Sequence, residues 1–205
     1  MVVIVDYGLG NLQSILNMLK KLGVKAIISS KHDEIMNSAK LILPGVGSFD
    51  FAMNKINDLG LKSILDEKVM VERTPILGIC LGAQIMTAGS EEGNMEGFGW
   101  FDAKTVKFQF TDSNGSLKVP HMGWRDIECI KPSNLLINLP EESRFYFVHS
   151  YHFRTQHEED ILATAEYGYK FAVALEKNNI AGVQFHPEKS HKFGMTVLNN
   201  FINNF

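Results

Sequence analysis

The chain has 205 residues, of which 45 % are hydrophobic, and its 20 basic and 23 acidic side chains give a formal net charge of −3. This length and composition suit a full hydrophobic core, so we expect residues 1–205 to form one domain. No run of lysine and arginine favours a nucleic-acid or membrane surface, and no stretch approaches the ~18 apolar residues of a membrane span. Two cysteines are too few for a disulfide framework, and no basic leader precedes the first apolar run. We therefore expect a cytoplasmic protein without nucleic-acid or membrane partners.

Strand and helix patterns alternate over the first part of the chain. The expected strands are 2–5, 24–29, 41–43 and 75–79, and the expected helices are 12–22, 32–38, 50–57, 61–71 and 83–88. Such alternation predicts a mostly parallel sheet covered by helices.

After residue 89 the β-like runs become shorter and helical periods become rare. We expect strands at 103–110, 127–130, 145–148, 161–167, 172–176 and 180–184, turns at 111–116 and 120–124, and a closing helix at 193–205. Cys129 flanks one of these runs and is expected in the core. The expected fold class is therefore α/β, with a central, mostly parallel sheet flanked by helices and an added antiparallel β portion.

The segment 78–84, GICLGAQ, places Cys80 between two glycines, after an apolar run and before helix-compatible residues. This order predicts a strand, a tight turn and a helix, as in the nucleophile elbow of serine hydrolases, with a thiol at the apex. The helix N-terminus would favour the thiolate, and the N–H of Leu81 is well placed to donate to an oxyanion. A buried core cysteine is the alternative interpretation.

A second glycine-rich turn, 44–49 (PGVGSF), follows the expected strand 41–43. Open α/β sheets bind ligands at the carboxyl ends of their strands, so its N–H groups can line a pocket beside the elbow. An ordinary strand-to-helix connection would also need glycine here.

A cysteine nucleophile needs a base, and the base needs a group that orients it. His186 follows an apolar strand, and Glu188 stands two residues later with Pro187 between them. In an extended segment these two side chains face the same way, so Glu188 can hold the far nitrogen of His186. A surface turn without chemistry is the alternative. No cluster has metal-ligand spacing, and the glycine pattern at 8–13 lacks the third glycine of a dinucleotide site, so we expect neither a metal nor a cofactor.

The elbow 78–84 and the segment 185–188 (FHPE) together resemble the two motifs of class I, triad-type glutamine amidotransferases. Four further segments resemble the glutaminase subunits of imidazole glycerol phosphate synthases: 6–12 (DYGLGNL), 44–49 (PGVGSF), 120–124 (PHMGW) and 186–190 (HPEKS). The similarity extends from about residue 2 to the closing helix.

The resemblance implies that Cys80 attacks the carboxamide carbon of glutamine, that His186 moves the proton, and that Glu188 orients His186. It also implies that the N–H groups of Leu81 and Val46 stabilise the oxyanion. The residues implied to hold glutamine are Gly47, Gln84, Glu92, Ser150 and Tyr151. Glu92 suits the substrate ammonium, and backbone groups near Ser150 suit its carboxylate.

Family members of this kind work as heterodimers with a (β/α)8-barrel synthase, which incorporates the ammonia into an imidazole ring during histidine biosynthesis. Pairing has a physical reason, because free ammonia is protonated at neutral pH and is best delivered through a dry channel. The resemblance places the segment 120–124 and Lys189 toward that partner.

Two positions depart from the family pattern: Arg125 replaces the usual Asn, and His152 replaces an aromatic residue or Arg. Because both are expected near the interface or the glutamine pocket, amidation of a surface sugar through a different synthetase is an alternative use of the ammonia. A cysteine peptidase or γ-glutamyl hydrolase of the same fold, and a scaffold without activity, are further alternatives. The segments 6–12 and 120–124 argue against the former, and the intact Cys80, His186 and Glu188 argue against the latter.

Overall fold

The computed structural model describes residues 1–110 and 117–205, and the turn expected at 111–116 lies outside the described residues. The strands are β1 (Val2–Val5), β2 (Ala26–Ser29), β3 (Lys40–Gly45), β4 (Ile76–Cys80), β5 (Thr87–Ser90), β6 (Phe101–Lys107), β7 (His121–Asp126), β8 (Glu128–Cys129), β9 (Arg144–His149), β10 (Tyr151–Thr155), β11 (Ile161–Tyr167), β12 (Tyr169–Lys177) and β13 (Ile180–Val183). The helices are α1 (Leu12–Lys21), α2 (His32–Met36), α3 (Phe49–Asp58), α4 (Leu61–Asp66), α5 (Leu81–Gln84) and α6 (His191–Asn203), with shorter or wider helical turns η1 (Glu67–Val71), η2 (Glu158–Asp160) and η3 (Pro187–Lys189).

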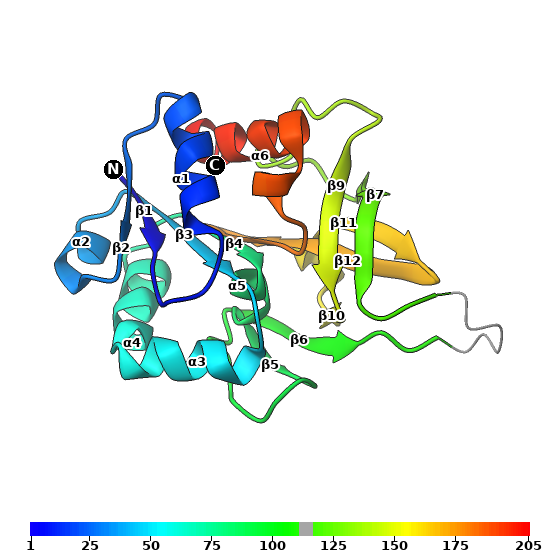
Figure 1. Cartoon of the computed structure of the whole chain (residues 1–205), viewed down its shortest axis with the longest axis horizontal. Coiled ribbons are helices and arrows are strands. Elements are labelled where there is room, and N and C mark those ends of the chain that lie inside the picture. Colours follow the sequence, from blue (N-terminus) through cyan, green and yellow to red (C-terminus); the bar gives the residue numbers. More distant parts are fainter. Residues whose placement is uncertain (111–116) are drawn as a thin grey trace.

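One large sheet runs through the molecule (Figure 1), in the order β2-β1-β3-β4-β13-β12-β10-β6-β5. β11 also pairs with β12, and β8 pairs with β11. The five strands from β2 to β13 are parallel, whereas β13, β12, β10 and β6 pair antiparallel. A separate two-stranded sheet pairs β7 with β9. This arrangement confirms the expected α/β fold class with its added antiparallel portion.

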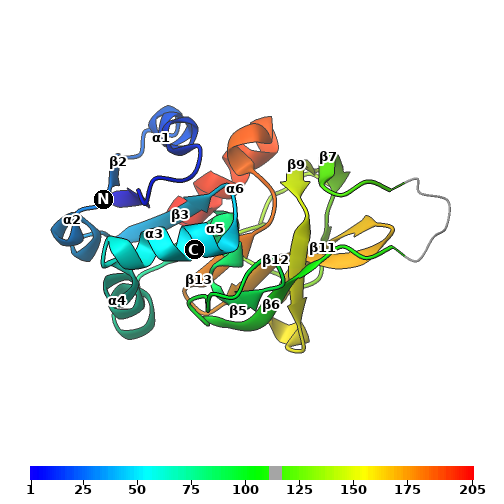
Figure 2. The same cartoon turned by 60° about the horizontal axis from the view of Figure 1, so that its bottom comes forward.

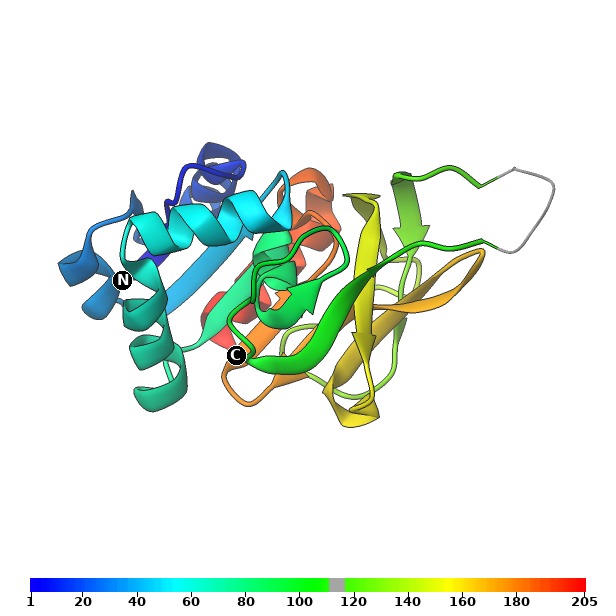
Figure 3. The same ribbon diagram turned by 90° about the horizontal axis from the view of Figure 1, so that it is seen from below.

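The inner parallel strands β1, β3, β4 and β13 are buried on both faces because helices cover each side (Figures 2 and 3), whereas the edge strand β2 is mostly half-buried. Successive side chains of β1 point to opposite faces. Val2 and Ile4 therefore join the apolar cluster of α1 and α6, whereas Val3 and Val5 join the cluster of α3 and α4.

The carboxyl edge of this sheet positions the candidate site. β4 lies between β3 and β13, with Gly45 paired to Cys80 on one side and Val183 paired to Ile79 on the other. The next residue after Val183, Gln184, therefore lies opposite Cys80, and His186 comes two residues further along the chain. The register of two parallel neighbours thus joins residues that are more than a hundred positions apart in the sequence.

Two expected elements are wrong. The helix expected at 83–88 ends at Gln84, whose carbonyl accepts a hydrogen bond from Thr87 Oγ1 at 2.8 Å, and Thr87 then begins β5 beside β6. The turn expected at 120–124 is instead largely strand β7, which pairs with β9 over six residues. In both cases a distant strand supplies the pairing that the local sequence does not contain.

Cys129 is exposed rather than buried in the core. It ends β8, which is only two residues long and lies at the edge of the sheet beside β11. An edge strand this short buries neither face.

Candidate active site

The elbow around Cys80 is a sharp, strained turn between β4 and α5. Cys80 adopts φ 53° and ψ −113°, in the left-handed region that side chains with a Cβ rarely occupy. A Cβ at Gly82 would lie 1.7 Å from Leu43 O, and one at Gly78 would lie 2.7 Å from Ala83 Cα. The two glycines are therefore required by the close approach of neighbouring backbone, and they let the helix begin directly after the thiol.

His186 and Glu188 form a buried pair. Nδ1 of His186 lies 2.8 Å from Glu188 Oε1, and both side chains are 2 % exposed. The sequence predicts this contact from an extended segment, but a turn brings the two side chains together instead. Pro187 and Glu188 lie in the 3₁₀ turn η3, and His186 is its N-cap residue with an extended backbone. Ser190 Oγ donates to His186 O at 2.7 Å and thereby closes this turn.

The hydrogen bond to Glu188 determines which nitrogen of His186 is available for chemistry. Because a carboxylate accepts, Nδ1 carries a proton and Nε2 is left as the free nitrogen, buried and without a hydrogen-bond partner in the described structure. Burial lowers the pKa of His186, but the neighbouring Cys80 and Glu188 outweigh it and raise that pKa overall. The imidazole can therefore hold a proton beside the thiol.

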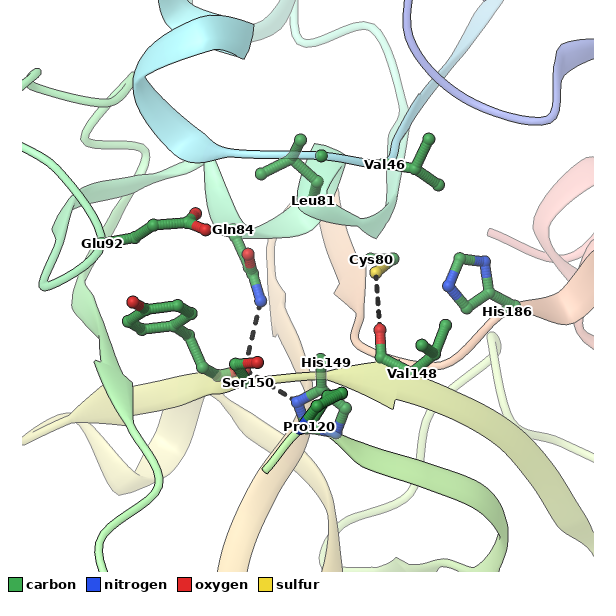
Figure 4. A pocket seen from close by; sticks show the side chains of 12 residues that line it. Val46, Cys80, Leu81, Gln84, Glu92, Pro120, Val148, His149, Ser150 and His186 are labelled. Carbon is green, nitrogen blue, oxygen red and sulfur yellow. Dashed lines mark hydrogen bonds between the residues drawn. The ribbon is translucent and has the colours of Figure 1, made fainter. Parts of the chain in front are cut away.

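Cys80 Sγ has two long polar contacts. It lies 4.0 Å from Val148 O (Figure 4) and 3.7 Å from Nε2 of Gln184. Neither contact is short enough to hold the thiol in a fixed orientation, so the sulfur is free to turn toward a substrate or toward His186, which lies at its side in Figure 4.

A cavity of about 280 Å³ opens over the thiol. Nine of the ten residues expected to form the site line it: Val46, Gly47, Cys80, Leu81, Gln84, Glu92, Ser150, Tyr151 and His186. The tenth, Glu188, lies behind His186. Pro120, Val148 and His149 also line the cavity and were not expected there. The sequence contains no pattern that places these three residues at the cavity. Pro120 directly precedes β7, Val148 and His149 end β9, and these two strands come together only in the folded sheet.

Glu92 and Gln84 lie on the opposite side of Cys80 from His186 (Figure 4). Glu92 Oε2 accepts a hydrogen bond from Phe49 N at 2.8 Å. Gln84 Nε2 donates to Gln184 Oε1 at 3.0 Å and to Tyr151 O at 3.2 Å. Gln184 thus links the thiol to Gln84, a role that only the register of β4 and β13 discloses.

A buried histidine pair supports the wall of the cavity. Nδ1 of His149 must donate to Tyr151 O, 2.7 Å away, because a carbonyl only accepts. His149 Nε2 therefore accepts from Nδ1 of His121 at 3.0 Å. Burial lowers the pKa of His121 to about 4 and that of His149 to about 3, so both rings are neutral at pH 7.

This pair predicts acid sensitivity of the fold. In the unfolded chain both rings take up protons near pH 6.5, so stability is complete above pH 6.5 and is lost as the pH falls toward 4. We expect the free energy of unfolding to drop by roughly 4 kcal/mol between pH 7.5 and 5, about half of it from each ring, measured by urea denaturation. His121→Gln, which keeps a donor for His149, should reduce this drop, whereas the control His32→Gln, an exposed histidine on α2, should keep it. An equal drop in all three proteins would contradict the prediction.

In residues 1–110 and 117–205, no group of three His, Cys, Asp or Glu side chains is arranged to hold a metal ion. In the same residues, no helix combines the length and the apolar character that crossing a membrane requires.

Comparison with known proteins agrees with this geometry. Residues 3–205 match the family described as glutamine amidotransferase class-I. The chain belongs to the class I glutamine amidotransferase family. Among its curated relatives are proteins named imidazole glycerol phosphate synthase subunit HisH 2, from Methanococcus maripaludis (52 % identity) and Pseudomonas aeruginosa (47 % identity). Each alignment spans 98 % of this chain and 98 % of the relative. A protein named imidazole glycerol phosphate synthase subunit HisH, from Leptospira interrogans, is 44 % identical, and the alignment again covers 98 % of both chains.

Solved structures share the fold at much lower identity. A glutamine amidotransferase matches with a TM-score of 0.72 and 20 % identity, covering 98 % of this chain and 97 % of that one. PurLQS from Thermotoga maritima matches with a TM-score of 0.70 and 16 % identity, covering 98 % of this chain and 97 % of that one. The fold is therefore that of the family.

Proposed function

We propose that this chain hydrolyses glutamine to glutamate and ammonia through a thioester on Cys80, and that it does so as the glutaminase subunit of an imidazole glycerol phosphate synthase. The observation that carries the proposal is the meeting of a strained elbow cysteine with a buried His–Glu pair at one cavity. The relatives at 44–52 % identity, which carry that subunit's name, supply the pathway.

In the proposed reaction, Cys80 Sγ attacks the carboxamide carbon of glutamine while His186 Nε2 takes the thiol proton. The N–H groups of Leu81 and Val46 stabilise the resulting oxyanion; Leu81 begins α5, where backbone donors have no partner within the helix. His186 then gives its proton to the amide nitrogen, the C–N bond breaks, and ammonia leaves a γ-glutamyl thioester. Water attacks the thioester, with His186 as the base, and releases glutamate. Glu188 holds the imidazole in the required tautomer throughout.

The remaining cavity residues bind the amino-acid part of the substrate. Glu92 has one carboxylate oxygen on Phe49 N, and the other is available for the substrate ammonium. Backbone groups around Ser150 and Tyr151 bind its carboxylate, and Gly47 and Gln84 line the path of the side chain.

We propose that a (β/α)8-barrel synthase subunit binds in a heterodimer over the side of the cavity that β7 borders, and that both work in the cytoplasm. Pro120 lines the cavity, and Met122, two residues further along, is 60 % exposed. An exposed apolar side chain beside the cavity mouth suits an interface that encloses ammonia.

The test is glutamate release from glutamine by the purified chain, alone and with a barrel subunit of imidazole glycerol phosphate synthase and its nucleotide substrate. We expect weak activity alone and a large increase in the pair. No hydrolysis in either condition, with folded protein and reduced Cys80, would refute the proposed nucleophile.

Glutaminase activity that ignores this barrel would favour sugar amidation through another synthetase. Neither of the two departures that suggested this alternative lines the cavity. His152 is buried, and its Nε2 lies 2.8 Å from Tyr169 Oη. The other, Arg125, lies on β7 with its guanidinium 5.3 Å from the ring centre of Tyr167. It therefore shares the inward face of β7 with the buried His121, opposite to the face of the exposed Met122.

A further inference from the structure

Glu92 lies in an irregular segment between β5 and β6, and regular hydrogen bonding does not fix its position. Asp50, in the first turn of α3, holds this segment from outside the cavity. Its Oδ2 accepts from Asn94 N at 3.0 Å, and its Oδ1 accepts from Met95 N at 2.9 Å. The carboxylate of Asp50 thus binds two successive backbone N–H groups just after Glu92.

The fit between Asp50 and this segment is close. A Cβ built on Gly93, between Glu92 and Asn94, would lie 2.0 Å from Oδ1 of Asp50. The backbone therefore passes directly against the carboxylate, and only glycine permits this approach.

A second hydrogen bond runs in the opposite direction. Glu92 Oε2 accepts from Phe49 N at 2.8 Å, at the start of the same helix. Ser48, the N-cap residue of α3, makes no side-chain capping bond, so Glu92 takes that place. Phe49 is fully buried and anchors this helix end in the core. The segment and the helix are thus joined reciprocally, by Asp50 toward the segment and by Glu92 toward the helix.

A carboxylate that is fixed before the ligand arrives loses little conformational freedom on binding it. We propose that Asp50 is a positioning residue that fixes Glu92 for the α-ammonium group of glutamine, and so determines selectivity for amino-acid amides. Asp50 does not line the cavity, so it acts on the substrate through Glu92. This inference rests on the proposed glutaminase function and on the role of Glu92 within it.

The experiment compares two substrates, glutamine and glutaramate, which is glutamine without its α-ammonium group. Both are measured on the full chain with the barrel subunit that stimulates it. We expect Asp50→Ala to raise KM for glutamine about tenfold while kcat changes little, because a misplaced Glu92 weakens ground-state and transition-state binding alike. The kcat/KM for glutaramate should stay unchanged, since that substrate has no ammonium for Glu92 to bind.

Three further variants isolate the role of Asp50. Asp50→Asn keeps one acceptor oxygen and should recover part of the loss. Asp58→Ala, an exposed aspartate at the other end of α3, is the matched control and should behave as wild type. In a Glu92→Gln background, Asp50→Ala should cause no further loss of discrimination between the two substrates. If glutaramate turnover falls below detection, inhibition by glutamate and by glutarate gives the same comparison.

The outcomes distinguish this inference from the proposed function. If the wild type cleaves glutamine but Asp50→Ala lowers kcat/KM equally for both substrates, Asp50 is only structural and the inference is wrong. An unchanged preference in Asp50→Ala and Asp50→Asn also overturns it. If the wild type cleaves neither substrate, the proposed function itself fails.

Discussion

Replacing Cys80 with alanine should abolish glutamine hydrolysis, with a loss of about 10⁴-fold or more in kcat, because it removes the thiol that forms the thioester. The hydroxyls of Ser150 and Tyr151, which also line the cavity, are much weaker nucleophiles than a thiolate. The fold should survive the change. Among the described residues the thiol makes only the two long contacts to Val148 O and Gln184 Nε2, so its removal leaves no strong hydrogen bond unmade there. Glutamate release measures the loss, and thermal unfolding checks the fold.

The second cysteine supplies the control for this experiment. Cys129 is exposed at the end of β8, far along the sheet from β4, and Cys129→Ala should leave glutaminase activity unchanged. Alkylation of the wild type should abolish activity, and alkylation of Cys129→Ala should abolish it equally. The Cys80→Ala chain should still support synthesis by the barrel partner when ammonia is supplied directly. Residual glutaminase activity in Cys80→Ala, or its loss in Cys129→Ala, would contradict the assignment.

The parallel half of the fold could be predicted from the sequence because its signals are local. Apolar runs, helical spacing and turn glycines follow one another along the chain, and each parallel strand is followed by a helix that covers it. The elbow belongs to this half, so Cys80, Leu81 and the turn that contains Val46 could all be placed at one edge of the sheet from the residues alone.

The antiparallel half could not be predicted to the same depth because its pairings are non-local. β7 pairs with β9 across the segment 127–143, and nothing in the segment 120–124 discloses a strand. Cys129 has apolar neighbours in the sequence, yet it is exposed because its strand lies at the sheet edge. Local sequence patterns indicate which residues can be buried, whereas the pairing of the strands decides which residues are buried.

The candidate site shows the same limit. Gln184 is two residues from His186 in the chain, but its contact with Cys80 follows only from the register of β13 against β4. The bond between Phe49 N and Glu92 joins residues 43 positions apart and has no signature in spacing. A sequence motif can thus identify reacting groups, while the groups that hold them in place come from the folded chain.

Glu188→Gln should lower kcat for glutamine by roughly a thousandfold to ten-thousandfold, with little change in KM. Glutamine has nearly the shape of glutamate, so the packing around residue 188 is kept. Its amide N–H can donate to Nδ1 of His186, which would move the ring proton to Nε2, the nitrogen that must accept the thiol proton. KM should be nearly unaffected, because Glu188 lies behind His186 and does not line the cavity.

The pH profile separates this role from a general loss of structure. Glu188 is one of the groups that raise the pKa of His186, so its neutral replacement lowers that pKa. His186 must carry a proton to release ammonia, and the alkaline limb of kcat/KM should therefore move to lower pH. Glu166→Gln, an exposed change on β11, is the matched control and should retain the wild-type profile. A Glu188→Gln enzyme with wild-type kcat, or with a reduced kcat and an unmoved alkaline limb, would show that the carboxylate does not act through His186.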